Sequence, residues 1–465
     1  MEQMQKYLAF RQRFPEFIYE RYEIEVAPRQ VVLTFHFSVP GLADFAPQWT
    51  LPLPEVPVLS PDHPIFRRLV FSLGLVELVS YWKIACPPVV RIRCGQLDDW
   101  QKQWWKQQYL SGLGEFFYKN GITATLEDFM EIRSEGEDIA FDGSARPLKG
   151  CMIPVGGGKD SIVTLELLQA QRADSCCYMM NPRGATLASA RLAGYQEEQI
   201  VGIHRTLDPA MLELNRQGYL NGHTPFSALV AFSGVLLAAI YGKKYLVLSN
   251  ESSANESTVA GSNVNHQYSK SFQFEQDFND YERRYIGSGV HYFSLLRPWS
   301  EFQIAGWFAR LIRYHADFRS CNVGSKTDSW CGHCPKCLFV WVILSPFLST
   351  GQLESIFGRN LAEDETLWET LCQLCGMTVE KPFECVGSRD EICFALRDAI
   401  RRMEQQGETL PLLYQRFRKT PVWTGYQDQA NPYYDYYNEE NLLPEVFDQL
   451  MRQASCALKE EHGHD

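Results

Sequence analysis

The sequence lacks an apolar segment long enough to span a bilayer. A membrane-spanning helix needs roughly 20 apolar residues, and the longest apolar runs in the 465-residue sequence, 226–241 and 338–344, are shorter. They predict buried helices and no membrane insertion. Residues 1–20 mix charged and aromatic side chains without the apolar core of a secretory signal, so we expect a cytoplasmic protein.

Positive charge is also scarce, and the formal net charge is −12. Proteins that bind a nucleic-acid backbone usually present a basic face. The acidic balance therefore predicts a partner other than nucleic acid, although it leaves room for a local basic pocket that binds a phosphorylated small molecule. Repeats and low-complexity tracts are absent as well, and the 45% hydrophobic content is typical of a globular protein.

Length and local composition divide the chain into three regions. A chain of 465 residues usually holds two or three domains. We expect residues 1–145 to be β-rich up to about residue 95, because 31–37 are β-branched and aromatic and proline-rich turns follow over 40–64. Residues 95–119 are expected to be helical, and residues 346–465 mainly helical.

Between residues 146 and 345, short apolar strands alternate with helices. Strands are expected at 151–155, 175–180, 199–204 and 244–249, and helices at 162–171, 185–193 and 225–241. This alternation predicts parallel βαβ units, and so an α/β fold whose parallel sheet is covered on both faces. Ligands bind such sheets at the carboxyl ends of the strands.

A glycine-rich turn joins the first of these strands to its helix and consists of Gly156, Gly157, Gly158, Lys159, Asp160 and Ser161. Glycines let a ligand approach the backbone closely, and a helix N-terminus offers free N–H groups and the positive end of its dipole to an anion. Lys159 can add a positive charge and Ser161 a hydroxyl donor. The turn therefore predicts a cofactor-binding site for an anion, with a plain strand-to-helix turn as the alternative.

Two common phosphate loops do not fit this turn. A Walker A loop needs Ser or Thr after its lysine, where Asp160 stands, and a dinucleotide loop needs glycine where Ser161 stands. The turn resembles the S-G-G-x-D-S signature of the PP-loop ATP pyrophosphatases, with Gly156 in place of the first serine. The resemblance implies a sheet of PP-loop type and a loop that holds the pyrophosphate of ATP while a substrate is adenylated.

Polar residues also follow the fourth predicted strand, where Asn250 and Glu251 are expected to bind the cofactor. Glu251, with Asn255 and Glu256, is a candidate for holding Mg²⁺, because this ion prefers carboxylate, water and phosphate oxygens. A solvated loop is an equally compatible interpretation. The polar run 265–270 is expected to be a substrate loop.

Four of the 14 cysteines, Cys321, Cys331, Cys334 and Cys337, follow the pattern C-x9-C-x2-C-x2-C. Close spacing lets thiolates converge on one metal, and four thiolates complete a tetrahedral structural zinc site. An iron–sulfur cluster is the alternative, because closely spaced cysteines also bind clusters. Cys372 and Cys375 lie on a predicted helix and are expected to be buried thiols.

Five strings together resemble the family of bacterial UDP-N-acetylmuramoyl-L-alanyl-L-glutamate epimerases: MIPVGGGKDSIVTLELL (152–168), SNESSANES (249–257), NHQYSKSF (265–272), WCGHCPKCLFVW (330–341) and KPFECVG (381–387). The resemblance covers nearly the whole chain and implies an ATP-dependent enzyme of peptidoglycan precursor synthesis. Such an enzyme converts the terminal L-Glu of UDP-MurNAc-L-Ala-L-Glu to D-Glu through an acyl-adenylate and releases AMP and pyrophosphate. A similar cysteine block is structural in the PP-loop 7-cyano-7-deazaguanine synthases, which favours zinc.

Such an inversion needs a general base. His266 and Lys270 are candidates through their position in the predicted substrate loop, and Cys385 is a candidate because cofactor-free amino-acid epimerases can use thiolates. A structural role for Cys385 is at least as compatible with the sequence.

Two other functions stay open at this point. A PP-loop enzyme that modifies nucleobases, by tRNA thiolation or deazaguanine nitrile formation, fits the cysteine block but fits the acidic charge and the long N-terminal region less well. A non-catalytic nucleotide-binding module is supported by Gly156 at the serine position and opposed by the intact Asp160 and Ser161. The oligomeric state is left open.

Overall fold

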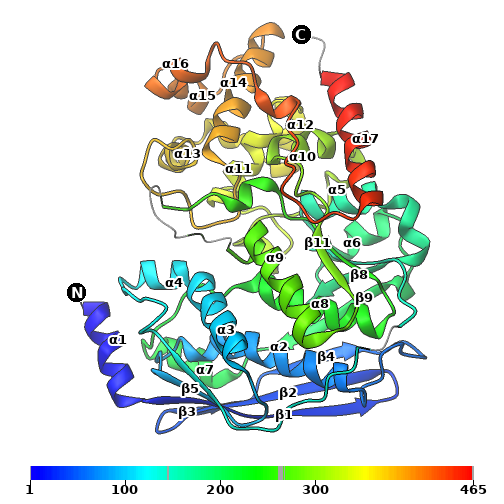
Figure 1. The fold of residues 1–465 in the computed structure, drawn as a ribbon. Helices are drawn as coiled ribbons and strands as arrows, with labels where there is room; N and C mark the ends of the chain where they lie inside the picture. Colours follow the sequence, from blue (N-terminus) through cyan, green and yellow to red (C-terminus); the bar gives the residue numbers. More distant parts are fainter. Residues whose placement is uncertain (1, 144–145, 260–264, 266–267, 463–465) are drawn as a thin grey trace.

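A computed structural model of the chain describes residues 2–143, 146–259, 265 and 268–462. Within these residues, eleven strands form one sheet in the order β11-β10-β7-β8-β9-β4-β2-β1-β5-β6, with β3 paired to β2 (Figure 1). The strands are β1 (Glu16–Ala27), β2 (Gln30–Val39), β3 (Ala43–Phe45), β4 (Gln48–Pro52), β5 (Val89–Ile92), β6 (Glu131–Ser134), β7 (Cys151–Pro154), β8 (Cys176–Met180), β9 (Ile200–Thr206), β10 (Tyr245–Leu248) and β11 (His291–Ser294).

The strands β7 to β11 form a continuous run of five parallel strands, in the order β11-β10-β7-β8-β9. The strands expected at 151–155, 175–180, 199–204 and 244–249 are β7, β8, β9 and β10, which confirms the predicted α/β fold with a mostly parallel sheet. The chain runs one way from β7 to β9 and then returns to the other side of β7 for β10. Ligands of open α/β sheets bind at such a reversal, outside the carboxyl ends of the strands.

Successive residues of these strands pack into two different hydrophobic cores. Met152 and Leu246 belong to the core that also holds the N-terminal region, whereas Ile153 and Val247 belong to the core beneath the C-terminal helices. Alternate side chains of a strand point to opposite faces of its sheet. The sheet is therefore covered on both faces, which explains why its strands are apolar throughout.

Helices of different regions cover the two faces. The first face packs against α2 (Pro64–Trp82), α8 (Phe226–Ile240) and α9 (Phe272–Tyr281), and the second against α5 (Lys159–Leu167), α6 (Gly184–Leu192), α10 (Glu301–Ala309) and α11 (Pro335–Leu344). The helix expected at 162–171 begins earlier, at Lys159, and gives way to a 3-10 segment after Leu167. Those expected at 185–193 and 225–241 are α6 and α8.

The N-terminal region contains more helix than the sequence predicts. Besides α1 (Glu2–Arg13), it holds α2, which begins at the last proline of the stretch expected to form turns. Proline is favoured in the first turn of a helix, and His63 accepts a hydrogen bond from the backbone N–H of Ile65 as a cap. The expectation of β-rich structure up to residue 95 is therefore wrong over 64–82. The helices expected over 95–119 are α3 (Asp99–Gly112) and α4 (Gly114–Lys119).

The N-terminal strands belong to the same sheet as the parallel strands β7 to β11. The two parts join where β4 pairs antiparallel with β9. A buried ion pair reinforces this seam, in which the Arg205 guanidinium lies 2.7 Å from the carboxylate of Glu77 on α2. The indole of Trp49 donates a hydrogen bond of 3.2 Å to the same carboxylate. The N-terminal region is thus held directly against the parallel strands.

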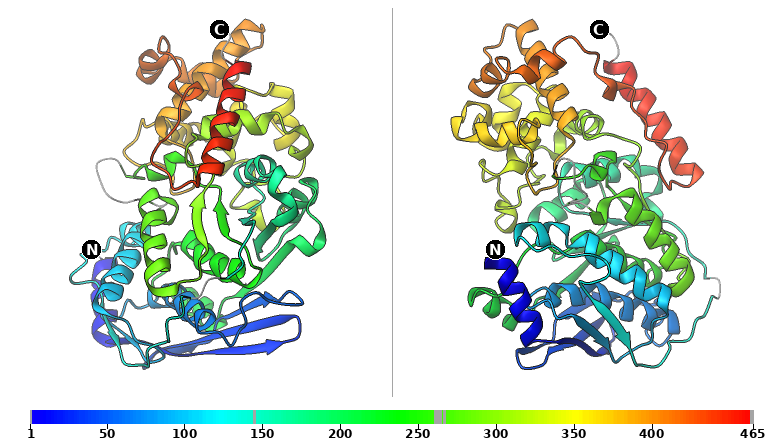
Figure 2. Two further views of the ribbon diagram at one scale, coloured as in Figure 1. Left: turned by 45° about the vertical axis from the view of Figure 1, so that its right-hand side comes forward. Right: turned by 60° about the vertical axis from the view of Figure 1, so that its left-hand side comes forward.

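The C-terminal region is mainly helical, as predicted, and contains α12 (Thr350–Phe357), α13 (Trp368–Leu374), α14 (Arg389–Gln405), α15 (Leu412–Phe417), α16 (Pro421–Tyr426) and α17 (Glu445–His462). Figure 2 shows these helices at the end of the molecule opposite β1 and β2. In the described part of the chain, no helix is long and apolar enough to cross a membrane.

Candidate active site and cysteine centre

The glycine-rich turn lies where the sheet order reverses, between β7 and α5. Gly157 has a φ of +80°, and a Cβ there would stand 3.0 Å from the backbone of Ala185, so only glycine fits. Gly158 caps α5 without a side-chain hydrogen bond to the helix N–H groups. A Cβ on Gly156 would meet nothing within 4 Å. The turn therefore leaves the N-terminus of α5 available to an anion.

A cavity of about 470 Å³ opens at this turn. Its lining includes Gly156, Gly158, Asp160 and Ser161 of the turn, Asn250 after β10, Lys270, Cys385, and the basic residues Arg183, Arg319 and Lys336. Residues of the three expected segments, the turn, the end of β10 and the polar run, thus meet at one cavity. His266 lies outside the described residues.

Three carboxylates gather beside the turn. Asp160, Glu251 and Glu301 each offer an oxygen within 4.8 Å of the others, and Glu251 and Glu301 are buried. The ammonium group of Lys159 is buried and bonds to the carboxylates of Asp160 and Glu301. Lys159 therefore neutralises these carboxylates and does not line the cavity, where the sequence predicted it to add a charge for an anion. An oxygen cluster of this kind suits a hard divalent cation.

The charges of this cluster depend on one another. Burial acts to lower the pKa of Lys159, but the two carboxylates hold it above its usual value. Burial acts to raise the pKa of Asp160, but Lys159 and Lys336 hold it below its usual value. The pKa of Glu301 is raised, mainly by burial. Asp160 is therefore ionised at neutral pH, and the buried Glu301 is a carboxylate that a bound cation would stabilise.

Glu301 is a site residue that the sequence did not reveal. It is the first residue of α10 and follows Ser300, which forms a capping box with Gln303. Its backbone N–H donates a hydrogen bond of 2.6 Å to Glu391 on α14. The capping pattern in the sequence indicates a helix start, but only the packing of α10 against α5 brings this carboxylate to Asp160.

The other polar candidates after β10 have different partners. Glu256 pairs with Lys381 and Arg389, and the Asn255 side chain accepts a hydrogen bond of 2.9 Å from the backbone of Phe272. Asn250 lines the cavity and donates a hydrogen bond of 2.9 Å to Ser294. Of the acidic candidates after β10, Glu251 alone joins the carboxylate cluster among the described residues.

Lys270 and Cys385 meet at the cavity, although they are far apart in the sequence. Burial acts to lower the pKa of Lys270, but Cys385 and Glu251 raise it, and its side chain is hydrogen-bonded to Cys385. The Lys336 ammonium bonds to the Cys385 carbonyl oxygen. An ammonium group beside a thiol favours the thiolate, which is the reactive form of cysteine.

A fully buried arginine connects the backbone at Glu251 to the backbone at Lys270. Arg297 donates hydrogen bonds of 2.7 Å to the carbonyl oxygen of Glu251 and 2.5 Å to that of Lys270. Its guanidinium also lies 3.1 Å from the Glu275 carboxylate. One side chain therefore sets the positions of a carboxylate residue and of the Lys270 segment.

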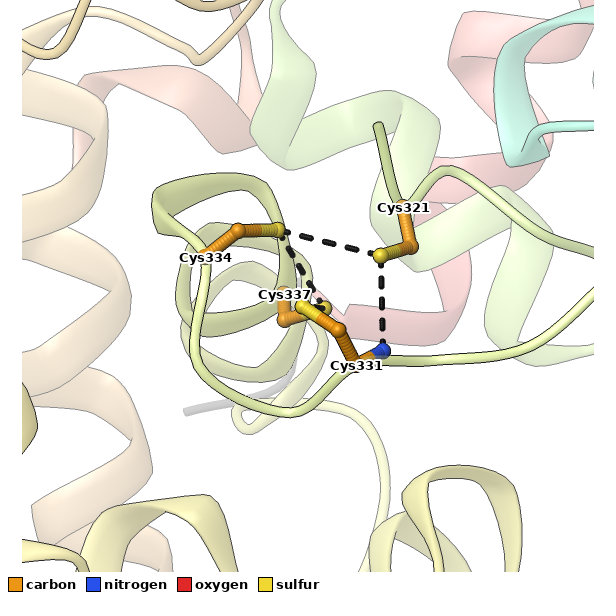
Figure 3. A group of neighbouring side chains, drawn as sticks. All are labelled: Cys321, Cys331, Cys334 and Cys337. Atoms are coloured by element: carbon orange, nitrogen blue, oxygen red, sulfur yellow. Dashed lines mark hydrogen bonds between the residues drawn. The ribbon is translucent and has the colours of Figure 1, made fainter. Parts of the chain in front are cut away.

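The four predicted metal-binding cysteines converge on one point (Figure 3). The sulfur of Cys334 lies 3.9 Å from that of Cys321 and 3.5 Å from that of Cys337, and the sulfurs of Cys331 and Cys337 are 3.7 Å apart. Sulfurs at about 2.3 Å from one tetrahedral ion stand about 3.8 Å apart. The spacing fits a single ion, whereas cluster ligands bind different irons and stand farther apart.

Backbone N–H groups support this cysteine centre. The N–H groups of Gly324 and Cys331 lie 3.1 and 3.4 Å from the sulfur of Cys321, where they would stabilise a thiolate. Cys372 lies on α13 and Cys375 is the capping residue that follows it; Cys375 is buried, as predicted, whereas Cys372 is only half-buried. The Cys393 thiol donates to the Cys375 carbonyl oxygen. Neither Cys372 nor Cys375 belongs to the group of four.

Two family models together match most of the chain. They describe the MurL N-terminal domain, matched by residues 9–295, and the MurL C-terminal domain, matched by residues 317–425. No solved structure matches the chain.

Curated relatives agree with these models. A protein from Xanthomonas oryzae pv. oryzae named UDP-N-acetyl-alpha-D-muramoyl-L-alanyl-L-glutamate epimerase is 38% identical over 344 residues, which are 71% of this chain and 74% of that protein. Proteins of the same name from Micromonospora sp. and Salinispora tropica are 33% and 32% identical over 83% of this chain and over 86% and 84% of their own length. The resemblance inferred from the sequence is confirmed, and the chain belongs to the MurL family.

Proposed function

We propose that this protein is an ATP-dependent epimerase of peptidoglycan precursor synthesis, which inverts the terminal L-Glu of UDP-MurNAc-L-Ala-L-Glu. The observation that carries the proposal is one cavity in which a glycine-rich helix start, a carboxylate cluster and the Lys270–Cys385 pair meet. The names of the curated relatives support the substrate and the inversion. The PP-loop-like turn supports ATP as the second substrate.

In this proposal, the glycine-rich turn binds the phosphates of ATP. The N–H groups at the start of α5 would bind the phosphates that leave as pyrophosphate, and Ser161 and Arg319 lie in the same cavity wall. Asp160, Glu251 and Glu301 would hold Mg²⁺, which neutralises phosphate charge and polarises the bond that breaks. The strand order, which reverses at β7 and β10, supports a sheet of PP-loop type.

The chemical reason for consuming ATP is the weak acidity of the glutamyl Cα–H. Removal of that proton beside a carboxylate would place two negative charges together. Attack of the α-carboxylate on the α-phosphorus forms an acyl-adenylate and releases pyrophosphate. The carboxyl group then carries no charge of its own and accepts electron density, so a base can remove the Cα proton. Return of a proton on the other face and hydrolysis give the D-glutamyl product and AMP.

We assign the base to Cys385, paired with Lys270. The pair lines the cavity together with the turn, and the ammonium group favours the thiolate. Lys270 stays protonated in this pair, because Cys385 and Glu251 raise its pKa against the effect of burial. His266 stays a candidate from the sequence alone.

The cysteine centre has a structural role in the proposal and would hold zinc. It lies at the start of α11, where the N–H of Lys336 donates a hydrogen bond of 2.9 Å to Glu384, the neighbour of Cys385. Four thiolates leave no open coordination position for a substrate. The centre therefore fixes the segment that bears Cys385 and takes no part in the reaction.

The proposal is tested by following ATP and substrate together. Purified protein is incubated with ATP, Mg²⁺ and UDP-MurNAc-L-Ala-L-Glu, and AMP, pyrophosphate and the glutamate enantiomers are quantified. We expect AMP only when the dipeptide substrate is present, in step with the D-glutamyl product. Asp160→Asn should lose both products. Inversion without ATP, or ADP in place of AMP, would contradict the adenylation step.

A further inference from the structure

An inversion requires one group to take the Cα proton and a second to return a proton on the opposite face. We propose that His223, oriented by Glu115, is this second proton-transfer residue and acts on the glutamyl Cα of the activated substrate. The inference rests on the proposed function, and it gives the N-terminal region a part in the chemistry.

His223 lies at the wall of the candidate active-site cavity. It lines the same cavity as Lys270, Cys385 and the glycine-rich turn. Its side chain is 21% exposed, and its Nδ1 lies 3.4 Å from a carboxylate oxygen of Glu115, which is 8% exposed. A partly exposed imidazole at a cavity wall, backed by a buried carboxylate, is the arrangement that orients histidine for acid–base catalysis.

The N-terminal region fixes the loop that bears His223. The ammonium group of Lys83 bonds to the carbonyl oxygen of Gly222 and, at 2.7 Å, to the Thr224 hydroxyl. Asn120 donates a hydrogen bond of 3.2 Å to the carbonyl oxygen of Asn221. Contacts on both sides of His223 therefore hold its backbone, and Glu115 holds its ring.

Nδ1 of His223 faces the Glu115 carboxylate, so we assign the exchange of a proton with the substrate to Nε2. During one inversion, a proton leaves Cα for one group, either the Cys385 thiolate or Nε2 of neutral His223. The other group, the protonated imidazole or the thiol, gives its proton to the opposite face. The electron pair of the broken C–H bond rests meanwhile on the activated acyl group, and solvent restores both groups.

His223→Gln tests the assignment in D₂O with ATP and Mg²⁺, starting separately from the L-glutamyl and D-glutamyl substrates. We expect inversion to fall about 10²–10⁴-fold. Deuterium should still enter Cα of one isomer without inversion, because Cys385 remains. Cys385→Ala should show the complementary result, with exchange confined to the other isomer. Glu115→Gln should lower inversion less, and His204→Gln, on the exposed side of β9, should not change it.

Other results would overturn the inference. If His223→Gln raises only the KM for the dipeptide substrate, or slows exchange of both isomers equally, His223 binds substrate and transfers no proton. If the His223→Gln variant inverts the substrate at the wild-type rate, His223 has no role in the reaction. Wild-type protein that forms no AMP and no D-glutamyl product would instead refute the proposed function itself, so the two failures are distinguishable.

Discussion

Replacement of Arg297 by methionine separates the contribution of one buried side chain to stability from its contribution to the site. The guanidinium is fully buried, pairs with Glu275 and donates to the carbonyl oxygens of Glu251 and Lys270. Methionine fills much of the volume but leaves the Glu275 carboxylate buried without its partner. Removal of one member of a buried ion pair costs about 3–5 kcal/mol, which is a large part of a typical unfolding free energy of about 5–15 kcal/mol.

A second substitution separates the effect of Arg297 on stability from its effect on the geometry of the site. Glu275→Gln removes the stranded charge but keeps a side-chain acceptor for the backbone N–H of Ser294, 3.3 Å away. We expect Arg297→Met/Glu275→Gln to recover about 0.5–3 kcal/mol of the loss, as contacting pairs do in double-mutant cycles. Activity should not recover, because the carbonyl oxygens of Glu251 and Lys270 still lack their donor.

Urea unfolding gives the free energies, and AMP formation gives the activity at a temperature where circular dichroism shows both variants folded. Arg205→Met is the matched control, since it breaks a buried ion pair with Glu77 away from the cavity and should lose stability without a specific loss of kcat. Activity that returns in step with stability in the double variant would refute the positioning role of Arg297. A loss below about 1 kcal/mol in Arg297→Met would refute the energetic argument.

Three further predictions concern the metals and the pH dependence. Elemental analysis should find one zinc per chain, and Cys334→Ser should lose it and lower the melting temperature; iron in place of zinc would contradict the assignment. Glu301→Gln should raise the Mg²⁺ concentration for half-maximal AMP formation by about tenfold or more, while Glu256→Gln, outside the carboxylate cluster, should not. Burial raises the pKa of Glu282, whose carboxyl group accepts a hydrogen bond from the backbone N–H of Ser288. The protonated Glu282 therefore stabilises the fold fully below the ordinary carboxyl pKa of about 4.3, and this stabilisation is lost as pH rises through the raised pKa, so the melting temperature should fall over that range. The Glu282→Gln variant should show a smaller decrease in melting temperature as pH rises. A pH profile identical to that of the wild type would show that Glu282 does not cause the decrease.

Local patterns explain what the sequence predicted. The strands β7 to β10 and the glycine-rich turn are visible because apolar runs, helix starts and glycines lie within a few residues of one another. The four cysteines are likewise close in sequence. For these features, the spacing of neighbouring residues already determines the geometry.

The rest depends on contacts between distant segments. α2 was missed because it is buried on nearly all sides and its apolar residues show no helical period. Glu301 reaches Asp160 only through the packing of α10 on α5, and Cys385 lines the same cavity as Lys270 although more than 100 residues separate them in the sequence. The reversal of strand order at β7, which places the cavity, is a property of the whole sheet and of no single segment.

The central claim, inversion through an activated carboxylate, is tested most directly by the reaction in D₂O. Purified protein, UDP-MurNAc-L-Ala-L-Glu and Mg²⁺ are incubated with and without ATP, and the glutamate is released and resolved by chiral chromatography with mass detection. The account predicts D-glutamate with one deuterium at Cα, formed only with ATP and in step with AMP. D-glutamate without deuterium, or formed equally well without ATP, would contradict it.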